Sequence, residues 1–320
     1  GLPGLELRTR PVRRAGLYVP GGRAAYPSTV LMTAIPATVA GVKEIALASP
    51  ASSDGSLPVA ILAAASIAGV TEVYRIGGAQ AIAAFAYGTD SVPAVDVIAG
   101  PGNIYVTLAK REVFGLVGID AIAGPTEILI IADETAPADF LAADLASQLE
   151  HDPLAFAVLV TTSAALGRAV TEAFEGLVVN LDRREVVGAA HCRIVLVESI
   201  AEAVQISNAF APEHLELVVA EPEVWLDQIE NAGAIFVGSL AAVSLGDYVA
   251  GTNHSLPTAG SARFSSPLGV HTFLKRTSIA RLSGSDFAEL AEPCITMANM
   301  EGLTAHAHAV RVRLASMENR

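Results

Sequence analysis

Three segments contain imidazole, carboxylate or amide side chains at spacings that could support metal binding or proton transfer. In the first, SQLEH (147–151), Gln148 and His151 stand three residues apart and therefore share one face of a helix. An amide oxygen and an imidazole nitrogen on one face can both bind a divalent metal. A helix that simply ends in a polar turn, with its histidine favoured by the negative end of the helix dipole, shows the same spacing. Both interpretations stay open.

The second segment, APEHL (211–215), places Glu213 beside His214 immediately before an apolar run. Histidine has an ordinary pKa that suits general-base chemistry near neutral pH. In a fold built on parallel sheets, such a pair lies where ligands bind if it stands at the carboxyl edge. An exposed polar turn after Pro212 is the alternative.

The third segment is a long loop, 238–267, rich in glycine, serine and threonine, in which Asp247 and His254 have no evident packing role. Loops carry function more often than packed elements do. Near the C-terminus, Glu301, His306 and His308 add further polar groups. The two histidines cannot face the same way from a helix, so we expect at most one of them to be a ligand, and a surface position is the alternative for either.

The elements that must position these groups alternate between short β-branched runs and longer alanine-rich runs, which predicts parallel sheets covered on both faces. The expected strands are Gly16–Val19, Glu44–Ala48, Glu72–Ile76, Asp96–Ile98, Ile128–Ala132, Phe156–Thr161, Arg193–Val197, Leu215–Val219 and Ala234–Val237. The expected helices are Ser28–Ala40, Pro58–Ala68, Ala79–Tyr87, Asn103–Phe114, Ala138–Glu150, Ser163–Glu175, Ile200–Ala209 and Glu221–Asn231.

These strands are too many for one sheet of this kind, and the segment AIAGPT (121–126) is a plausible boundary. The sequence therefore predicts an α/β protein with two partial doubly wound, Rossmann-like domains, 16–126 and 127–267. Residues 1–15 precede them, and 268–320 are expected to form a helical tail. Within that tail, Leu268–Arg276 and Thr304–Ser316 are predicted helices, with no strands.

Glycine-rich turns follow several expected strands, at 20–22, 77–80 and 99–103. Each could let a phosphate group approach the first turn of the following helix. None of them has the GxGxxG pattern of a dinucleotide-binding turn or the GxxxxGK[ST] pattern of a P-loop. Because neither pattern is present, tight turns between strands and helices are enough to explain these glycines.

Composition narrows the class of protein. Of the 320 residues, 52% are hydrophobic and 17% charged, which excludes a mainly disordered chain. The formal charge of −13 disfavours nucleic acid as a partner. The two cysteines, Cys192 and Cys294, lie far apart and form no CxxC motif, which excludes a disulfide framework and a zinc site built from cysteines. So few cysteines are typical of proteins in a reducing compartment. No signal peptide is recognisable, and the longest apolar run, Val59–Val70, is too short to span a membrane, so we expect a cytoplasmic protein.

Taken together and in order, the motifs resemble those of the histidinol dehydrogenase family along essentially the whole chain. They are GLYVPGG (16–22), PSTVLM (27–32), GGAQAIAAFAYGT (77–89), AGPGNIYVTLAKR (99–111), AGPTEILIIAD (123–133), SQLEHD (147–152), APEHLEL (211–217), GDYVAGTNHSLPT (246–258), FLKRTS (273–278) and LTAHAHAVRVR (303–313). The resemblance implies a zinc- and NAD-dependent enzyme of histidine biosynthesis that oxidises L-histidinol, through L-histidinaldehyde, to L-histidine.

The resemblance also implies roles for individual residues. Glu213 and His214 would be catalytic: His214 takes the alcohol proton, and Glu213 activates the water that hydrates the aldehyde. The implied zinc ligands are Gln148, His151, Asp247 and His306. The implied substrate contacts are Thr126, Gln148, His151, His214, Asp247, His254, Glu301 and His306, and the implied NAD contacts are Tyr18, Gln80 and Asn103. Thr126 stands where many members of the family carry serine, and its hydroxyl is retained.

Members of the family are homodimers, so we expect the tail to carry Glu301 and His306 into the active site of a second copy. The family's motifs begin at Gly16, and we expect that a further N-terminal segment is missing from this chain. Two other functions stay open. One is a related zinc- and NAD-dependent dehydrogenase acting on another small alcohol, such as a sulfonated diol. The other is an inactive fragment or binding protein, although no implied site residue is lost.

Overall fold

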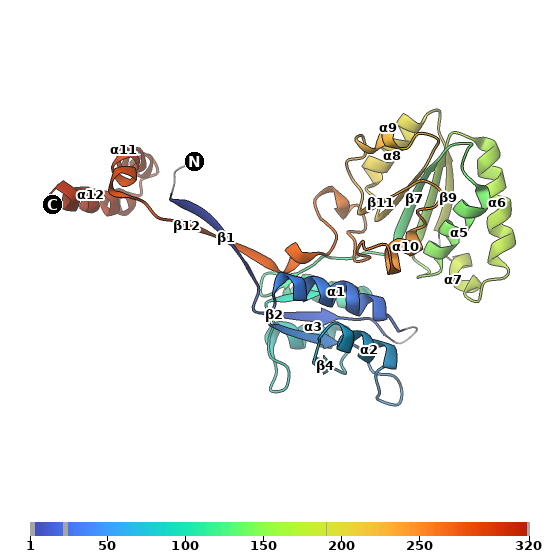
Figure 1. Cartoon of the computed structure of the whole chain (residues 1–320), viewed down its shortest axis with the longest axis horizontal. Coiled ribbons are helices and arrows are strands. Elements are labelled where there is room, and N and C mark those ends of the chain that lie inside the picture. The colour runs from blue at the N-terminus through green and yellow to red at the C-terminus, as the bar shows by residue number, and fades with distance from the viewer. Residues whose placement is uncertain (1–3, 22–24, 190, 319–320) are drawn as a thin grey trace. The chain divides into compact units, whose positions relative to one another are not determined.

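A computed structural model describes residues 4–21, 25–189 and 191–318 of the chain (Figure 1). The chain forms two compact units. The larger unit is Pro11–Phe273, and the smaller unit combines Gly1–Arg10 with Leu274–Arg320. The larger unit holds two parallel sheets, as the sequence predicts, and each has five strands.

The first sheet has the strand order β4-β3-β2-β5-β6. The chain starts at a central strand, adds two strands on one side and then returns to add two on the other, which is the doubly wound pattern. Its central strand is buried along its whole length. The strands are β2 (Arg14–Tyr18), β3 (Glu44–Ala48), β4 (Glu72–Tyr74), β5 (Val97–Ala99) and β6 (Gly118–Ile119).

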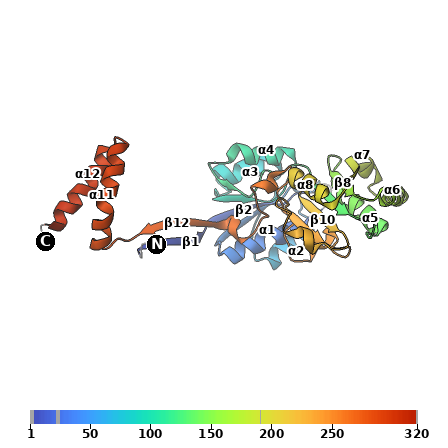
Figure 2. The same cartoon turned by 90° about the horizontal axis from the view of Figure 1, so that it is seen from above.

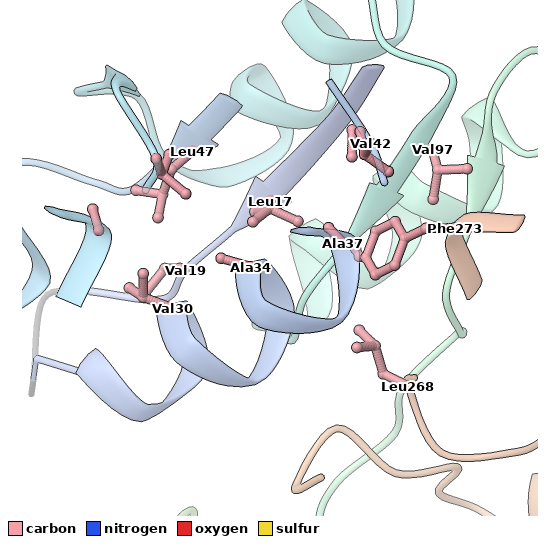
Figure 3. Close-up of a cluster of buried hydrophobic side chains, with 14 of the residues drawn as sticks. Leu17, Val19, Val30, Ala34, Ala37, Val42, Leu47, Val97, Leu268 and Phe273 are labelled. Carbon is pink, nitrogen blue, oxygen red and sulfur yellow. The ribbon is translucent and has the colours of Figure 1, made fainter. Parts of the chain in front are cut away.

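Two pairs of helices cover the two faces of this sheet (Figure 2). On one face, α1 (Pro27–Ala40) and α2 (Val59–Ile67) pack on Leu17 and Leu47, and Figure 3 shows this cluster with Val30 and Ala34 of α1. On the other face lie α3 (Gly78–Tyr87) and α4 (Ile104–Val113). The side chains of successive strand residues therefore alternate between two apolar cores.

The second sheet repeats the pattern with the order β11-β10-β7-β8-β9, so β7 and β10 are central neighbours. Burial of both faces explains its continuous apolar strands. Its strands are β7 (Glu127–Ala132), β8 (Phe156–Thr161), β9 (His191–Leu196), β10 (His214–Val218) and β11 (Ala234–Val237). On one face lie α5 (Ala138–Leu149), α6 (Ala164–Val178), α7 (Arg184–Ala189) and α10 (Val243–Tyr248), and on the other α8 (Ile200–Phe210) and α9 (Glu223–Leu226).

The smaller unit consists of a two-stranded sheet and two helices. Strand β1 (Leu5–Pro11) pairs with β12 (Leu274–Ala280), from the opposite end of the chain. Helix α11 (Gly284–Met300) begins with a capping box, in which Ser283 and Asp286 exchange hydrogen bonds. It packs against α12 (Thr304–Glu318) through a small apolar cluster.

The predicted helix at Leu268–Arg276 is wrong. A short 3₁₀ turn, Val270–Phe273, leads directly into strand β12. The expectation of a tail without strands fails with it. The β12 strand exists because residues 5–11 pair with it, and no local pattern of the sequence reveals a partner so distant along the chain. The helix predicted at Thr304–Ser316 is confirmed as α12.

Smaller differences concern irregular segments. The loop expected at 238–267 contains α10 and a 3₁₀ turn, Ser261–Arg263, and the helix expected at Glu221–Asn231 is only the short α9. Strands β1 and β6 and helices α7 and α11 were not predicted. The domain limits 1–15, 16–126, 127–267 and 268–320 stay predictions, and residues 1–3 lie outside the described part. No helix within the described ranges is long and apolar enough to cross a membrane.

We expect Phe85→Ala to destabilise the larger unit strongly. Phe85 of α3 is 1% exposed, and its ring fills the space beside Gly16, where an added Cβ would lie 2.7 Å from it. Truncating a buried aromatic side chain costs about 3–5 kcal/mol of unfolding free energy. Urea unfolding followed by circular dichroism measures the loss. Tyr87→Ala, on the same helix but 67% exposed, is the control and should change stability by less than about 0.5 kcal/mol; equal losses would contradict the packing described.

Candidate active site

The polar residues of the second sheet meet at one edge, where β7 and β10 begin. Thr126 directly precedes β7, and Glu213 directly precedes His214, the first residue of β10. The two strands pair in parallel with His214 opposite Ile128. Ligands usually bind at the carboxyl edge of such sheets, but this cluster lies at the amino edge.

The amino edge has its own electrostatic character, because helices that connect parallel strands run back and end there. Helix α5 ends at this edge with Gln148 and His151 in and just beyond its last turn. Helix α8 ends at Ala211, which has a left-handed φ of 53° immediately before Pro212 and Glu213. The C-terminal carbonyl groups of helices carry partial negative charge and favour a cation. This edge therefore suits a metal ion or a protonated substrate amine.

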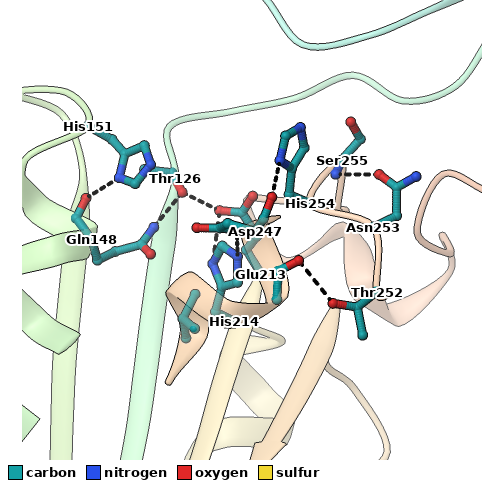
Figure 4. A network of polar contacts seen from close by, with 12 residues as sticks. Thr126, Gln148, His151, Glu213, His214, Asp247, Thr252, Asn253, His254 and Ser255 are labelled. Carbon is teal, nitrogen blue, oxygen red and sulfur yellow. Dashed lines mark hydrogen bonds and ion pairs between the residues drawn. The ribbon is translucent and has the colours of Figure 1, made fainter. Parts of the chain in front are cut away.

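One oxygen of Glu213 is held by two donors, of which Figure 4 shows the Thr126 hydroxyl. The Thr126 hydroxyl donates to Glu213 Oε2 at 2.6 Å, and the Glu127 N–H donates to the same oxygen at 3.0 Å. The Thr126 oxygen in turn accepts from the Gln148 amide. Glu213 is 6% exposed, and burial raises the pKa of its carboxyl, opposed by the nearby His214 and Thr126. A carboxylate with a raised pKa is a stronger base near neutral pH.

His214 presents one ring nitrogen to the site. Its Nδ1 lies 3.1 Å from the Glu127 carbonyl oxygen, so Nδ1 carries the proton and donates to the main chain. Its Nε2 is buried, makes no hydrogen bond to any described residue, and lies 3.9 Å from Asp247 Oδ1. A buried nitrogen whose lone pair accepts no hydrogen bond lowers the stability of the fold, unless a ligand bonds to it. His214 Nε2 is therefore available to accept a proton from a bound molecule.

Three residues of this unit offer lone pairs that suit a metal. His151 Nδ1 lies 3.0 Å from the Ser147 carbonyl oxygen and 3.2 Å from that of Gln148, so its proton is used there and Nε2 keeps a lone pair that bonds to no described residue. Gln148 uses its NH₂ group on Thr126, which leaves Oε1, and Asp247 adds a carboxylate from α10. Nitrogen and oxygen donors of this kind fit Zn²⁺.

This donor set is only part of a metal site. Among the described residues, no three His, Cys, Asp or Glu side chains are grouped closely enough to hold an ion by themselves. The other implied ligand, His306, and the implied substrate contact Glu301 are exposed and belong to the smaller unit, at the start of α12 and the end of α11. The donors of the larger unit thus fit the implied zinc and need a further ligand.

His254 is fixed between two elements of the larger unit. Its Nδ1 lies 3.1 Å from the Asp247 carbonyl oxygen, and its Nε2 lies 3.2 Å from the Thr29 hydroxyl on α1. Burial lowers the pKa of His254. The neighbouring Asn253 donates to the Met32 carbonyl oxygen at 2.7 Å. The loop that carries His254 is therefore anchored on α1, and burial favours the neutral form of the ring.

Sequence reasoning missed Glu127, the first residue of β7. It is 8% exposed, and its Oε1 accepts from the Ala259 N–H at 3.0 Å. Burial, and secondly the charge of Glu213, raise the pKa of Glu127 to about 7. An acid at the start of an otherwise apolar strand was the signal that could have revealed it.

A second pair of carboxyl groups, Glu216 and Asp144, lies on β10 and α5. Glu216 on β10 is 2% exposed, and its Oε1 accepts from the Val243 N–H, at the start of α10, at 3.3 Å. Burial, followed by the charge of Asp144, raises the pKa of Glu216 well above its ordinary value. Burial raises the pKa of Asp144, on α5, to about 6. An acidic residue within the apolar run HLELV (214–218) is the sequence feature that could have revealed Glu216.

The implied NAD contacts lie at the carboxyl edge of the first sheet. Tyr18 ends β2, Gln80 is exposed in the first turn of α3, and Asn103 caps α4 by accepting from two N–H groups at 3.1 and 3.2 Å. The Tyr18 hydroxyl accepts from the Gly78 N–H at 3.0 Å. The strand order reverses between β2 and β5, and such a switch point is where doubly wound folds bind ligands. Of the turn at 20–22, Gly22 lies outside the described residues.

Glu127→Gln should weaken the pH dependence of stability in the metal-free protein. A carboxyl whose pKa rises on folding contributes stability below its ordinary pKa of 4.5, and this stability is lost as the pH rises through about 7. The wild type should therefore lose more unfolding free energy than the variant between about pH 5 and about pH 8 in urea titrations. Glu134→Gln, in the exposed turn after β7, controls for the removal of one carboxylate. Equal pH dependence in the wild type and Glu127→Gln would contradict this assignment.

Comparisons with known proteins identify the family of the chain. The family model described as histidinol dehydrogenase matches residues 4–314. Histidinol dehydrogenase of Moorella thermoacetica is 55% identical over 307 residues, which cover 95% of this chain and 72% of that protein. The enzyme of a Synechococcus species is 53% identical over 317 residues, which cover 98% of this chain and 73% of that protein.

Solved structures give the same result. The crystal structure of histidinol dehydrogenase from Elizabethkingia anophelis has a TM-score of 0.94 and 39% identity, and the match covers 99% of this chain and 74% of that one. A propionaldehyde dehydrogenase from Clostridium phytofermentans, with a TM-score of 0.52 and 14% identity, shares the fold alone. The chain therefore belongs to the histidinol dehydrogenase family of NAD-dependent oxidoreductases.

Proposed function

We propose that this protein oxidises L-histidinol to L-histidine in two steps, each of which reduces one NAD⁺. The observation that carries the proposal is the buried pair Glu213 and His214. One oxygen of Glu213 is held by two donors, and His214 Nε2 has a free lone pair in a polar site. The family membership supplies the substrate.

His214 acts first in this proposal. Its Nε2 accepts the hydroxyl proton of histidinol while the hydrogen on the same carbon leaves as hydride to NAD⁺, which yields the aldehyde. The Glu127 carbonyl, 3.1 Å from Nδ1, stabilises the imidazolium that forms. The carboxylate of Glu213, 3.6 Å from Nδ1, contributes to the same stabilisation.

Glu213 acts in the second step. Its carboxylate removes a proton from the water that adds to the aldehyde carbon, while the proton held by His214 Nε2 passes to the aldehyde oxygen, and the product is a hydrate. His214 then accepts a proton from the hydrate as the second hydride leaves to a second NAD⁺. The raised pKa of Glu213 suits it to accept a proton, and the Thr126 hydroxyl keeps the carboxylate in place.

We assign zinc to Gln148, His151, Asp247 and His306, and the ion when bound orients the amine and imidazole of the substrate. The two free lone pairs and the carboxylate of the larger unit support this set. His254, fixed on Asp247 and Thr29, contacts the substrate together with Thr126 and Glu301.

Glu301 and His306 reach the site from the tail of a second copy, so the active protein is a homodimer with shared sites. NAD⁺ lies at the carboxyl edge of the first sheet, against Tyr18, Gln80 and Asn103. Free N–H groups at helix N-termini suit its pyrophosphate. The enzyme works in the cytoplasm, where the histidine pathway supplies histidinol.

Zinc-loaded protein mixed with L-histidinol and excess NAD⁺ should produce two equivalents of NADH for each histidinol consumed. A single oxidation would give one equivalent and leave the aldehyde. A strong chelator should abolish turnover, and added zinc should restore it. NADH absorbance and amino-acid analysis measure the two products. The absence of turnover in a folded, metallated dimer would overturn the proposal.

His214→Asn should slow the first hydride transfer by about 10²–10⁴-fold, because it removes the proton acceptor. Its zinc content should remain that of the wild type, because His214 is not among the assigned ligands. Stopped-flow detection of the first NADH and metal analysis separate the two effects. His191→Asn, at the exposed start of β9, is the matched control and should retain both rate and zinc. Loss of the metal in His214→Asn would refute the assignment of roles.

A further inference from the structure

Lys110 and Asp120 form a buried ion pair in the first domain, at the carboxyl edge of its sheet. Lys110 lies on α4 and Asp120 directly after β6, and their side chains are only 3% and 7% exposed. A buried ion pair is often no more stabilising than apolar side chains of the same size. Stability alone therefore does not explain this pair, and its other hydrogen bonds indicate its role.

Both members of the pair hold the main chain of a single residue, Gly100. Lys110 Nζ donates to the Gly100 carbonyl oxygen at 3.0 Å, and the Gly100 N–H donates to Asp120 Oδ2 at 2.7 Å. The other oxygen of Asp120 accepts from Lys110 and from the Ala121 N–H. A donor and an acceptor are both needed here, because one peptide C=O and one peptide N–H must be satisfied, and the pair supplies both.

Gly100 has a conformation that needs such support. Its φ is +119°, which side chains of L-residues rarely adopt, and an added Cβ would lie 2.1 Å from the Tyr18 carbonyl oxygen. The end of β5 therefore approaches the end of β2 very closely at this turn. The ion pair holds the turn in this conformation through both peptide groups of Gly100.

The turn lies at the switch point of the first sheet and leads into α4. Asn103 caps that helix, and the main-chain N–H groups of Gly102, Asn103 and Ile104 make no hydrogen bond within the described part of the chain. Their direction depends on the path of the chain from Gly100 onward. A shift of this turn would misdirect these groups and Asn103 together.

We propose that Lys110 and Asp120 are positioning residues for NAD⁺: by holding both peptide groups of Gly100, they fix the turn that presents Asn103 and the start of α4 to the dinucleotide. The inference rests on the proposed function, which places NAD⁺ at this edge. Neither side chain touches the cofactor. The pair acts on affinity for NAD⁺ and leaves the chemistry at Glu213 and His214 unchanged.

The test uses the full zinc-loaded chain and measures NAD⁺ binding directly by calorimetry, together with kinetics. Lys110→Met should raise the Kd and the KM for NAD⁺ about tenfold, since it removes a charged hydrogen bond and leaves Asp120 unpaired. The KM for histidinol, the zinc content and kcat should change by less than about twofold. Arg111→Met, the exposed neighbour on α4, removes the same charge and should leave NAD⁺ affinity unchanged.

A double variant separates positioning from a role in stability. Lys110→Met with Asp120→Leu replaces the pair by apolar side chains and should keep or raise the melting temperature, yet still weaken NAD⁺ binding about tenfold, because Gly100 loses both partners. Asp120→Asn keeps an acceptor for the Gly100 N–H and should show a smaller loss, about threefold.

The possible results are distinguishable. If the wild type binds no NAD⁺, the proposed function itself fails. If the wild type binds and the folded double variant binds equally well, the positioning role is overturned. If neither Lys110→Met nor the double variant folds, the pair serves the fold rather than the turn, which also overturns it.

Discussion

A single residue, Glu127 at the start of β7, holds both members of the proposed catalytic pair. Its N–H donates to the Glu213 carboxylate, and its carbonyl oxygen lies against His214 Nδ1. These contacts exist because β10 pairs with β7 in one register, with His214 opposite Ile128. A change of register by one residue would turn His214 to the other face of the sheet. The geometry of the site therefore depends on a strand pairing buried between two apolar cores.

The two sheets offer their ligands opposite electrostatic environments. In a parallel sheet flanked by helices, the helices begin at the carboxyl edge and end at the amino edge, so the edges differ in the sign of their partial charge. The cluster around Glu213 lies at the amino edge of the second sheet, which favours cations. Tyr18 and Asn103 lie at the carboxyl edge of the first sheet, which favours an anionic dinucleotide. One strand order, used twice, thus gives two edges of opposite partial charge, which suit the proposed metal and the proposed dinucleotide.

Much of the fold could be predicted from the sequence, because buried parallel strands and their helices have strong local patterns. The central strand β7 and helix α5 lie within a residue or two of their predicted bounds. The pairing of β1 with β12 could not be predicted, and the helix expected at Leu268–Arg276 is wrong for that reason. Local propensity carries no information about a partner from the other end of the chain.

For the site, the sequence by itself determined which chemical groups are available: an acid beside a histidine, an amide and a histidine on one helix face, and an acid in a loop. Tertiary structure decided how they are used. It brought Thr126 and Gln148 into one network with Glu213, and it left His214 Nε2 without a hydrogen bond to any residue that the structure describes. It also revealed the role of Glu127. Hydrogen bonds and burial join residues distant in the chain, so protonation and orientation are properties of the folded protein alone.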